Sequence, residues 1–291
     1  MVAFSETVTA MSEIVEVRKR PAWLRALGTS DPPEQITVGE KGYRRVHILK
    51  HDSWAATAIY SNDAGERIIC KFNRVQPVAG IPLAWVGRAL ARREAAFLRR
   101  LADIELIPKG FDGVFVGGWR LPNAMARRYV EGEPFRTTEQ VSPQFFEELR
   151  DLLGKLHATG VAYVDLHKRE NIIVDRGGHP HLIDFQVCVG ISDSWPGNSR
   201  LARYFIAKMQ DIDNYHFRKH VLRTIPHMLT PEQRAEYEQL PALIRAHRRI
   251  AVPLRTLRRK LLVLLRVRDA EGQATSEFEP EDAYRKKTTE T

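Results

Sequence analysis

The sequence predicts an α+β fold in which strands dominate the first half of the chain and helices the second. Alternating apolar residues indicate three strands, at 45–49, 56–60 and 67–72. Helical spacing of apolar residues predicts helices over 86–101 and 142–160. After the second helix, two short apolar runs flank a Gly-Gly turn and predict a β-hairpin over 172–184.

The third strand and the helix after it carry opposite charges on their packing faces. Lys71 shares a strand face with Ile69, because alternate strand residues point to the same side. Glu94 lies on the helix face that also carries Leu90 and Phe97. An ionised carboxylate on a packing face costs several kcal/mol unless it is paired. We therefore expect Lys71 and Glu94 to form an ion pair.

The hairpin is flanked by oxygen-bearing side chains. If its turn is centred between Gly177 and Gly178, Asn171 and Asp184 face each other across the strands. The free carboxylate of Asp165 comes shortly before. Two hard oxygen ligands suit Mg²⁺ that carries substrate phosphates, because this ion keeps most of its positions for water and phosphate. The sequence thus indicates phosphoryl transfer.

In this order, the residues resemble the motifs of the protein-kinase-like superfamily. Ile69-Cys-Lys71 loosely matches the valine-alanine-isoleucine-lysine strand, and Glu94 matches the helix-C glutamate. The catalytic-loop Asp and Asn are matched by Asp165 and Asn171, and Asp-Phe-Gly by Asp184-Phe-Gln186. The resemblance covers roughly residues 40 to 225. It implies a bilobal fold, with a β-rich N-lobe that holds one main helix and a trimmed, mostly helical C-lobe.

The resemblance also implies an activity, namely transfer of the γ-phosphate of ATP to a hydroxyl acceptor with the help of Mg²⁺. Asp165 would orient and deprotonate the acceptor hydroxyl, and Lys71, held by Glu94, would bind the ATP phosphates. Asn171 and Asp184 would hold the metal ion. Small bacterial kinases with short activation segments, such as the lipopolysaccharide (Kdo and heptose) kinases and the RIO-like kinases, look nearest. A sugar of lipopolysaccharide, a small molecule and a protein Ser/Thr remain open as acceptors.

Three departures from the kinase pattern affect the expected site. Five residues instead of four separate Asp165 from Asn171, and Lys168 in this loop could neutralise charge on the transferring phosphate. The expected Gly-rich loop reads Lys-His-Asp-Ser-Trp-Ala at 50–55 and has no glycine. Phosphate contacts there would come from backbone N–H groups and from Ser53. The segment after Asp184 is short, which leaves little platform for an extended peptide.

Two other classes of function stay open. A catalytically weak pseudokinase or scaffold would bind nucleotide without turnover, although such a protein needs neither the catalytic acid nor the metal ligands. A membrane- or nucleic-acid-associated binding protein would use the segment 244–268, which holds nine Lys or Arg residues and no acid. The net charge is +9, so the rest of the chain is balanced and general nucleic-acid binding is not expected. Leucines at 254, 257, 261, 264 and 265 give this segment an apolar side.

Composition and the positions of turn-forming residues predict the domain boundaries and the location of the protein in the cell. Hydrophobic residues make up 43% of the chain, which is ample for a core. Two cysteines and no leader-like apolar run favour a cytoplasmic protein, placed at the inner face of the membrane if the basic segment binds lipid. We expect an N-terminal extension and linker (1–37), the N-lobe (38–128), the C-lobe with the basic helix (129–269) and a disordered tail (270–291). The oligomeric state is not predicted.

The basic segment makes a prediction for lipid binding. Replacing Arg255, Arg258, Arg259 and Lys260 with glutamine should release the protein from anionic vesicles, because each basic residue contributes ~1 kcal/mol near such a surface. Sedimentation with acidic and neutral vesicles, over a range of salt concentrations, measures this. Equal binding to both vesicle types would contradict it. Unfolding of the variant would instead identify a structural C-lobe helix.

Overall fold

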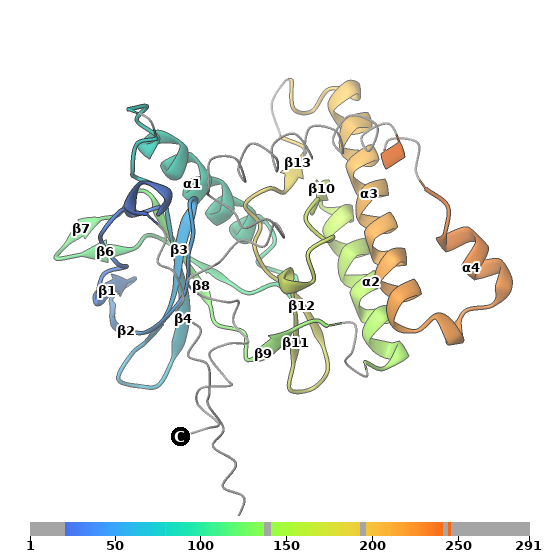
Figure 1. Ribbon diagram of the computed structural model, residues 1–291. Helices are drawn as coiled ribbons and strands as arrows, with labels where there is room; N and C mark the ends of the chain where they lie inside the picture. Colours follow the sequence, from blue (N-terminus) through green and yellow to red (C-terminus); the bar gives the residue numbers. More distant parts are fainter. Residues whose placement is uncertain (1–20, 79, 137–140, 193–195, 241–243, 246–291) are drawn as a thin grey trace, which may run out of the picture.

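The computed structural model describes residues 21–78, 80–136, 141–192, 196–240 and 244–245. A curled sheet with one long helix is joined to a mainly helical part by the chain around residues 128–132 (Figure 1). The basic segment beyond Arg245 and the whole of the predicted tail lie outside the described residues. Within the described residues, no helix combines the length and apolar character needed to cross a membrane.

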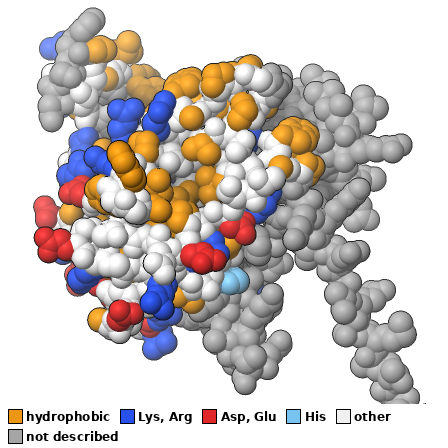
Figure 2. All heavy atoms as spheres, turned by 90° about the vertical axis from the view of Figure 1, so that its left-hand side faces the viewer, with side chains coloured by type: hydrophobic (Ala, Val, Ile, Leu, Met, Phe, Trp, Pro, Cys, Tyr) orange, Lys and Arg blue, Asp and Glu red, His pale blue; other side chains and the backbone are white. Residues whose placement is uncertain are grey.

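The first part is built on an antiparallel sheet that contains all three predicted strands. In the described residues its strand order is β5-β8-β4-β3-β2-β1-β6-β7. The bounds are Gln35–Val38 (β1), Lys41–His51 (β2), Ala55–Ser61 (β3), Arg67–Asn73 (β4), Gly110–Phe111 (β5), Phe115–Val116 (β6), Trp119–Arg120 (β7) and Ala124–Arg128 (β8). Figure 2 shows the side of the molecule that lies at the left of Figure 1. Hydrophobic side chains lie together in the upper part of this surface.

The two faces of this sheet pack against different partners. Ala58, Cys70 and Phe72 belong to a core on one face. The other face carries Lys71 and, opposite it on β8, Met125. Helix α1 (Ala84–Arg100) packs on this second face, and its Leu98 joins the same core as Met125. Glu94 of α1 therefore faces the strand that carries Lys71.

The helical part begins with α2 (Pro143–Ala158), which starts where the sequence predicts a helix. In the described residues it also contains α3 (Arg200–Thr224), η3 (Pro226–Met228) and α4 (Pro231–Tyr237), with the short strands β9 (Gly132–Pro134), β10 (Val161–Ala162) and β13 (Val189–Gly190). Ser142 caps α2 by accepting a hydrogen bond from the Phe145 amide, and Thr230 caps α4 in a full capping box. Leu149 and Leu153 of α2 pack in one core with Phe217 of α3. This core supports the hairpin that bears the site.

The hairpin forms, but its register differs by one residue from the predicted one. Its strands are β11 (Ile172–Asp175) and β12 (Pro180–Leu182), and Ile172 pairs with Leu182. Asp175 accepts hydrogen bonds from the amides of Gly177 and His179 at 2.8 and 2.9 Å. The Asp175 amide donates to the His179 carbonyl at 3.0 Å, so the turn is a three-residue loop instead of a two-residue one, and its last residue, Gly178, has φ +85°. The prediction that Asn171 faces Asp184 is wrong, because the Ile183 amide is the group that bonds the Asn171 carbonyl, at 3.0 Å.

The described part of the predicted N-terminal extension is folded onto the sheet. The boundary expected at 37/38 falls inside β1, which pairs with β2. A 3-10 turn, η1 (Ala22–Leu24), comes earlier, and Ala26 is fully buried. The Ala26 amide donates to the Asp52 carbonyl at 2.8 Å, and the Ala26 carbonyl accepts from the Val75 amide at 3.0 Å. This segment therefore ties the β2–β3 loop to the chain that follows β4.

Candidate active site

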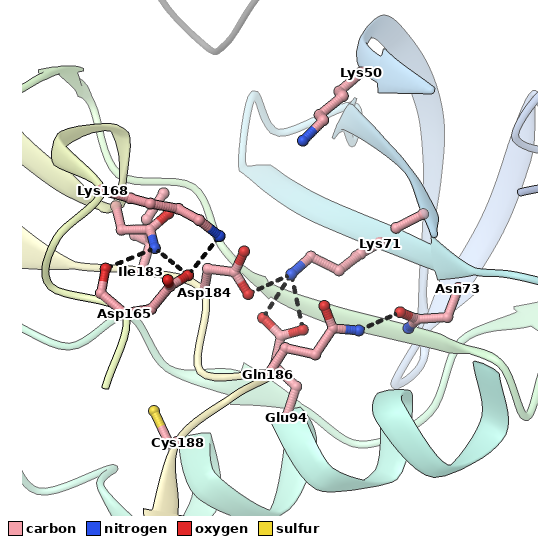
Figure 3. A network of polar contacts seen from close by, with 12 residues as sticks. Lys50, Lys71, Asn73, Glu94, Asp165, Lys168, Ile183, Asp184, Gln186 and Cys188 are labelled. Atoms are coloured by element: carbon pink, nitrogen blue, oxygen red, sulfur yellow. Dashed lines mark hydrogen bonds and ion pairs between the residues drawn. The ribbon is translucent and has the colours of Figure 1, made fainter. Parts of the chain in front are cut away.

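The site is centred on a lysine shared by two carboxylates. Lys71 Nζ lies 3.0 Å from Glu94 Oε2 and 2.9 Å from Asp184 Oδ1 (Figure 3). The predicted pairing of Lys71 and Glu94 is confirmed. The contact with Asp184 connects the sheet to the segment after the hairpin, so the same ammonium group holds the two parts of the molecule together.

Burial and charge act in opposite directions on these groups. Burial alone would lower the pKa of Lys71, but the carboxylates of Asp184 and Glu94 outweigh it and the pKa lies above its ordinary value. Burial alone would raise the pKa of Asp184, yet Lys71 brings it down to about 2. Lys71 is therefore a cation and Asp184 an anion at neutral pH. Glu94 is 1% exposed, so its paired ammonium group compensates for lost hydration.

A second group of polar side chains surrounds Asp165. Its Oδ2 accepts hydrogen bonds from Lys168 Nζ at 2.8 Å and from Asn171 Nδ2 at 2.9 Å. His167 Nδ1 lies 3.4 Å from the other carboxylate oxygen. The structure thus brings Asp165, Lys168 and Asn171 together, as the sequence predicts. Burial lowers the pKa of Lys168, but Asp165 raises it by more, so Lys168 stays charged.

The backbone is strained at Asp184 and at the residue immediately before Asp165. Among the described residues, Val164 and Asp184 are the non-glycine residues with positive φ, at 70° and 62°. A β-branched residue rarely adopts this conformation, and such strain is concentrated at functional sites. The Tyr163 hydroxyl donates to the carbonyl of Ile183, so the segments before Asp165 and before Asp184 are joined.

Asp213, which sequence analysis did not identify, holds the strained segment before Asp165. It is fully buried in α3 and accepts hydrogen bonds from the amides of Tyr163 and Val164, each at 2.7 Å. His157 donates to the same carboxylate at 3.1 Å. A signal was present, because Asp213 lies four residues before the buried Phe217 on α3. Glu94 was identified in the same way, as an acid on the apolar face of a helix.

Another missed contact joins the two parts of the molecule beside Lys71. Gln186 Nε2 donates to Asn73 Oδ1 at 2.6 Å, two residues beyond Asp184 and Lys71 respectively (Figure 3). Asn73 is fixed in turn, because its amide and side chain both donate to the Asn123 carbonyl, at 2.8 and 3.2 Å. Gln186 replaces the glycine of the Asp-Phe-Gly pattern. The change supplies a hydrogen bond that glycine lacks.

The side chains near the hairpin fit a magnesium ion bound with substrate phosphates. Asn171 donates its amide nitrogen to Asp165, which leaves its side-chain oxygen as a ligand. Asp184 uses one carboxylate oxygen for Lys71 and keeps the other. In the part of the chain that the structure describes, no cluster of three or more His, Cys, Asp or Glu forms a metal cage. One or two protein oxygens match the demand of Mg²⁺, which takes its other ligands from water and phosphate.

The sequence predicts that backbone N–H groups of the loop at 50–55 contact phosphate, but three of them form hydrogen bonds within the loop. Asp52 Oδ1 accepts hydrogen bonds from the amides of Trp54 and Ala55 at 2.7 and 2.9 Å. The Asp52 amide itself donates to the Ala55 carbonyl at 3.0 Å. These three N–H groups are therefore occupied within the loop. Ser53 is half-buried and its carbonyl accepts from Arg74, while its predicted role in phosphate binding stays a prediction.

Comparison with known proteins relates the chain to solved kinase structures. No protein-family model and no curated protein matches it. Two crystal structures of the Rio2 kinase from Chaetomium thermophilum are similar to it. One is its ADP/Mg²⁺-phosphoaspartate complex, with 16% identity and a TM-score of 0.45 over 71% of this chain and 61% of that one. The other has 16% identity, a TM-score of 0.44 and coverage of 71% and 62%. The chain spans about three fifths of their length.

The predicted bilobal, protein-kinase-like α+β fold is confirmed. The curled sheet, the single long helix α1 on the Lys71 face, and the hairpin set on helices α2 and α3 have the expected order and placement. The nearer placement beside lipopolysaccharide kinases stays a prediction.

The buried His220 makes a prediction for acid stability. Its Nε2 donates to the Leu166 carbonyl at 2.6 Å, next to Asp165. Burial lowers the pKa of His220 to about 4, and Arg169, Arg223 and Lys219 add to the effect. The unfolded chain gains this proton near pH 6.5 and the folded protein only near pH 4. Stability should therefore be complete above about pH 6.5 and fall as the pH drops towards 4, by ~3 kcal/mol from this residue.

Urea unfolding of the wild type and of His220→Gln, from about pH 7 to about pH 4.5, measures this contribution. The variant should lose less stability over the interval. His51 has a pKa lowered to about 4 as well and contributes equally to both proteins, so the difference isolates His220. Parallel curves for the two proteins would show that His220 does not titrate as described.

Proposed function

We propose that this chain is an ATP-dependent kinase that transfers the γ-phosphate to a hydroxyl acceptor. The observation that carries the proposal is the shared position of Lys71 between Glu94 and Asp184, with Asp165 and Lys168 beside them. A protein that only binds phosphate needs a cation such as Lys71. It does not need an acid such as Asp184, which keeps one carboxylate oxygen for a metal ion. This arrangement brings together a cation suited to phosphate, an acid suited to a metal ion and a carboxylate suited to act as a base.

Each residue has a role that follows from its contacts. Lys71 remains charged and is held by Glu94, so it can bind the α- and β-phosphates. Asp165 would accept the proton of the acceptor hydroxyl, and its bonds to Lys168 and Asn171 orient it for this step. Mg²⁺, when bound, would supply charge stabilisation between the phosphates.

Lys168 can contact both Asp165 and the phosphate that is transferred. Its ammonium group lies 2.8 Å from Asp165 and its side chain is partly exposed, so it can turn to a phosphate that binds beside Asp165. A cation beside the transferring group stabilises the negative charge that spreads over its oxygens. The short segment between Asp184 and α3 favours a sugar or small-molecule acceptor over an extended peptide. We propose a lipopolysaccharide sugar first and a protein Ser/Thr second.

The alternative is a protein that binds nucleotide without turnover. One observation favours it, since the three backbone N–H groups of the 50–55 loop described above are bonded within the loop. A kinase with fewer phosphate donors would position the γ-phosphate less firmly. Nucleotide binding without transfer would support this alternative.

Substitution of the two acids tests the proposed reaction. Asp165→Asn and Asp184→Asn should each reduce phosphoryl transfer by far more than about tenfold, the equivalent of ~1.4 kcal/mol in the barrier. Asp184→Asn should also weaken Mg-ATP binding, whereas Asp165→Asn should leave it nearly unchanged. Transfer of ³²P from γ-labelled ATP to fractions of a cell extract gives the readout and points to the acceptor.

The matched control is Asp211→Asn, which removes an exposed carboxylate of α3 that pairs with Lys208. This variant should retain full transfer. If either site variant kept activity within about tenfold of the wild type, the assigned roles would be wrong.

A further inference from the structure

The β2–β3 loop lies where a kinase would cover the nucleotide phosphates, and it is rigidly held. Arg74 is 2% exposed and donates to four backbone carbonyls, those of Trp23, Ser53, Gln76 and Pro77. The Arg74 amide donates to the Trp54 carbonyl at 2.8 Å. A loop held by these contacts, and by the bonds of Asp52 within it, does not release its N–H groups to a ligand at low cost.

A phosphate that enters here therefore needs another donor, and the sheet presents one. Lys50 pairs with Thr57 of β3, and Thr57 pairs with Lys71 of β4. Directly paired residues of an antiparallel sheet point to the same face. Lys50 and Lys71 thus lie in one row on the face of the sheet on which α1 packs, two strand spacings or ~10 Å apart. Figure 3 shows both side chains on this side of the sheet.

A β-bulge gives Lys50 this orientation. The register shifts between Ile48 and Lys50, which leaves Leu49 as an extra residue. Ile48 pairs with Ala58, whose side chain is part of the core on the opposite face. Without the bulge Lys50 would pair with Ala56, which also belongs to that opposite core. Bulges beside active sites commonly redirect a side chain in this way.

The ion pair of Lys50 with Asp52 is weak enough for a phosphate to replace the carboxylate. Its Nζ lies 2.8 Å from Asp52 Oδ2, and its side chain is 53% exposed. An exposed ion pair contributes at most ~1 kcal/mol. A nucleotide phosphate carries more charge than one carboxylate, so it can compete for the ammonium group.

We propose that Lys50 binds a phosphate of the bound nucleotide and replaces the N–H donors of a glycine-rich loop. The inference rests on the proposed function, because it assumes that ATP binds beside Lys71. Lys71 would hold the phosphates from β4, near α1, and Lys50 from β2, on the other side of β3. The triphosphate would span the row between the two lysines.

Nucleotide affinities of the full chain test this role. Lys50→Gln should weaken Mg-ATP binding by about tenfold, or ~1.4 kcal/mol, while adenosine binding changes by less than about twofold. Lys50→Arg keeps the charge and should restore most of the ATP affinity. Isothermal titration calorimetry with Mg-ATP and with adenosine gives both values, and thermal unfolding confirms that each variant is folded.

The matched control is Lys41→Gln, because Lys41 lies on the same strand, is 63% exposed and forms a 2.7 Å ion pair with Glu66. It should leave ATP binding unchanged. An equal loss for ATP and adenosine, or a Lys50 variant that matches the control, would overturn the role of Lys50 alone. A wild-type protein that binds no Mg-ATP would overturn the proposed function and this inference with it.

Discussion

The burial of the Glu94 carboxylate is the constraint on which the rest of the site depends. A carboxylate that is 1% exposed has lost its hydration, and it remains charged only if a cation meets it at close range. Lys71 does so from the central strand β4, and the same ammonium group reaches Asp184. Because Lys71 belongs to the sheet and Asp184 follows the hairpin, this interaction fixes how the two parts of the molecule face each other.

A second buried acid supports the other half of the site in the same way. Asp213 meets the amides of Tyr163 and Val164, which holds a strained backbone in place before Asp165. The bond from Tyr163 to the Ile183 carbonyl then connects this segment to Asp184. The carboxylates of Asp165 and Asp184 are therefore positioned by one connected set of buried contacts. Such preorganisation is what transfer chemistry needs, because little rearrangement is left for the reaction itself.

The sequence predicts those features of the site that depend on burial and on the order of residues. The Lys71–Glu94 pair follows from a charge on an apolar helix face, and Asp165, Lys168 and Asn171 come together as expected. Local backbone geometry was not predictable in this way. The hairpin register shifted by one because Asp175 binds the amides of its own turn, and the direction of Lys50 depends on a bulge at Leu49. Asp213 could have been found, because it satisfies the argument applied to Glu94.

We propose that Lys71 and Glu94 act as one unit in binding the nucleotide. A double-mutant cycle on Mg-ATP affinity tests it most directly, with Lys71→Met, Glu94→Gln and the double variant measured under the same conditions. If Glu94 acts by holding Lys71, the double variant should bind no more weakly than Lys71→Met alone, to within ~0.5 kcal/mol. Losses that add fully in the double variant would show instead that the two side chains contribute to nucleotide binding independently.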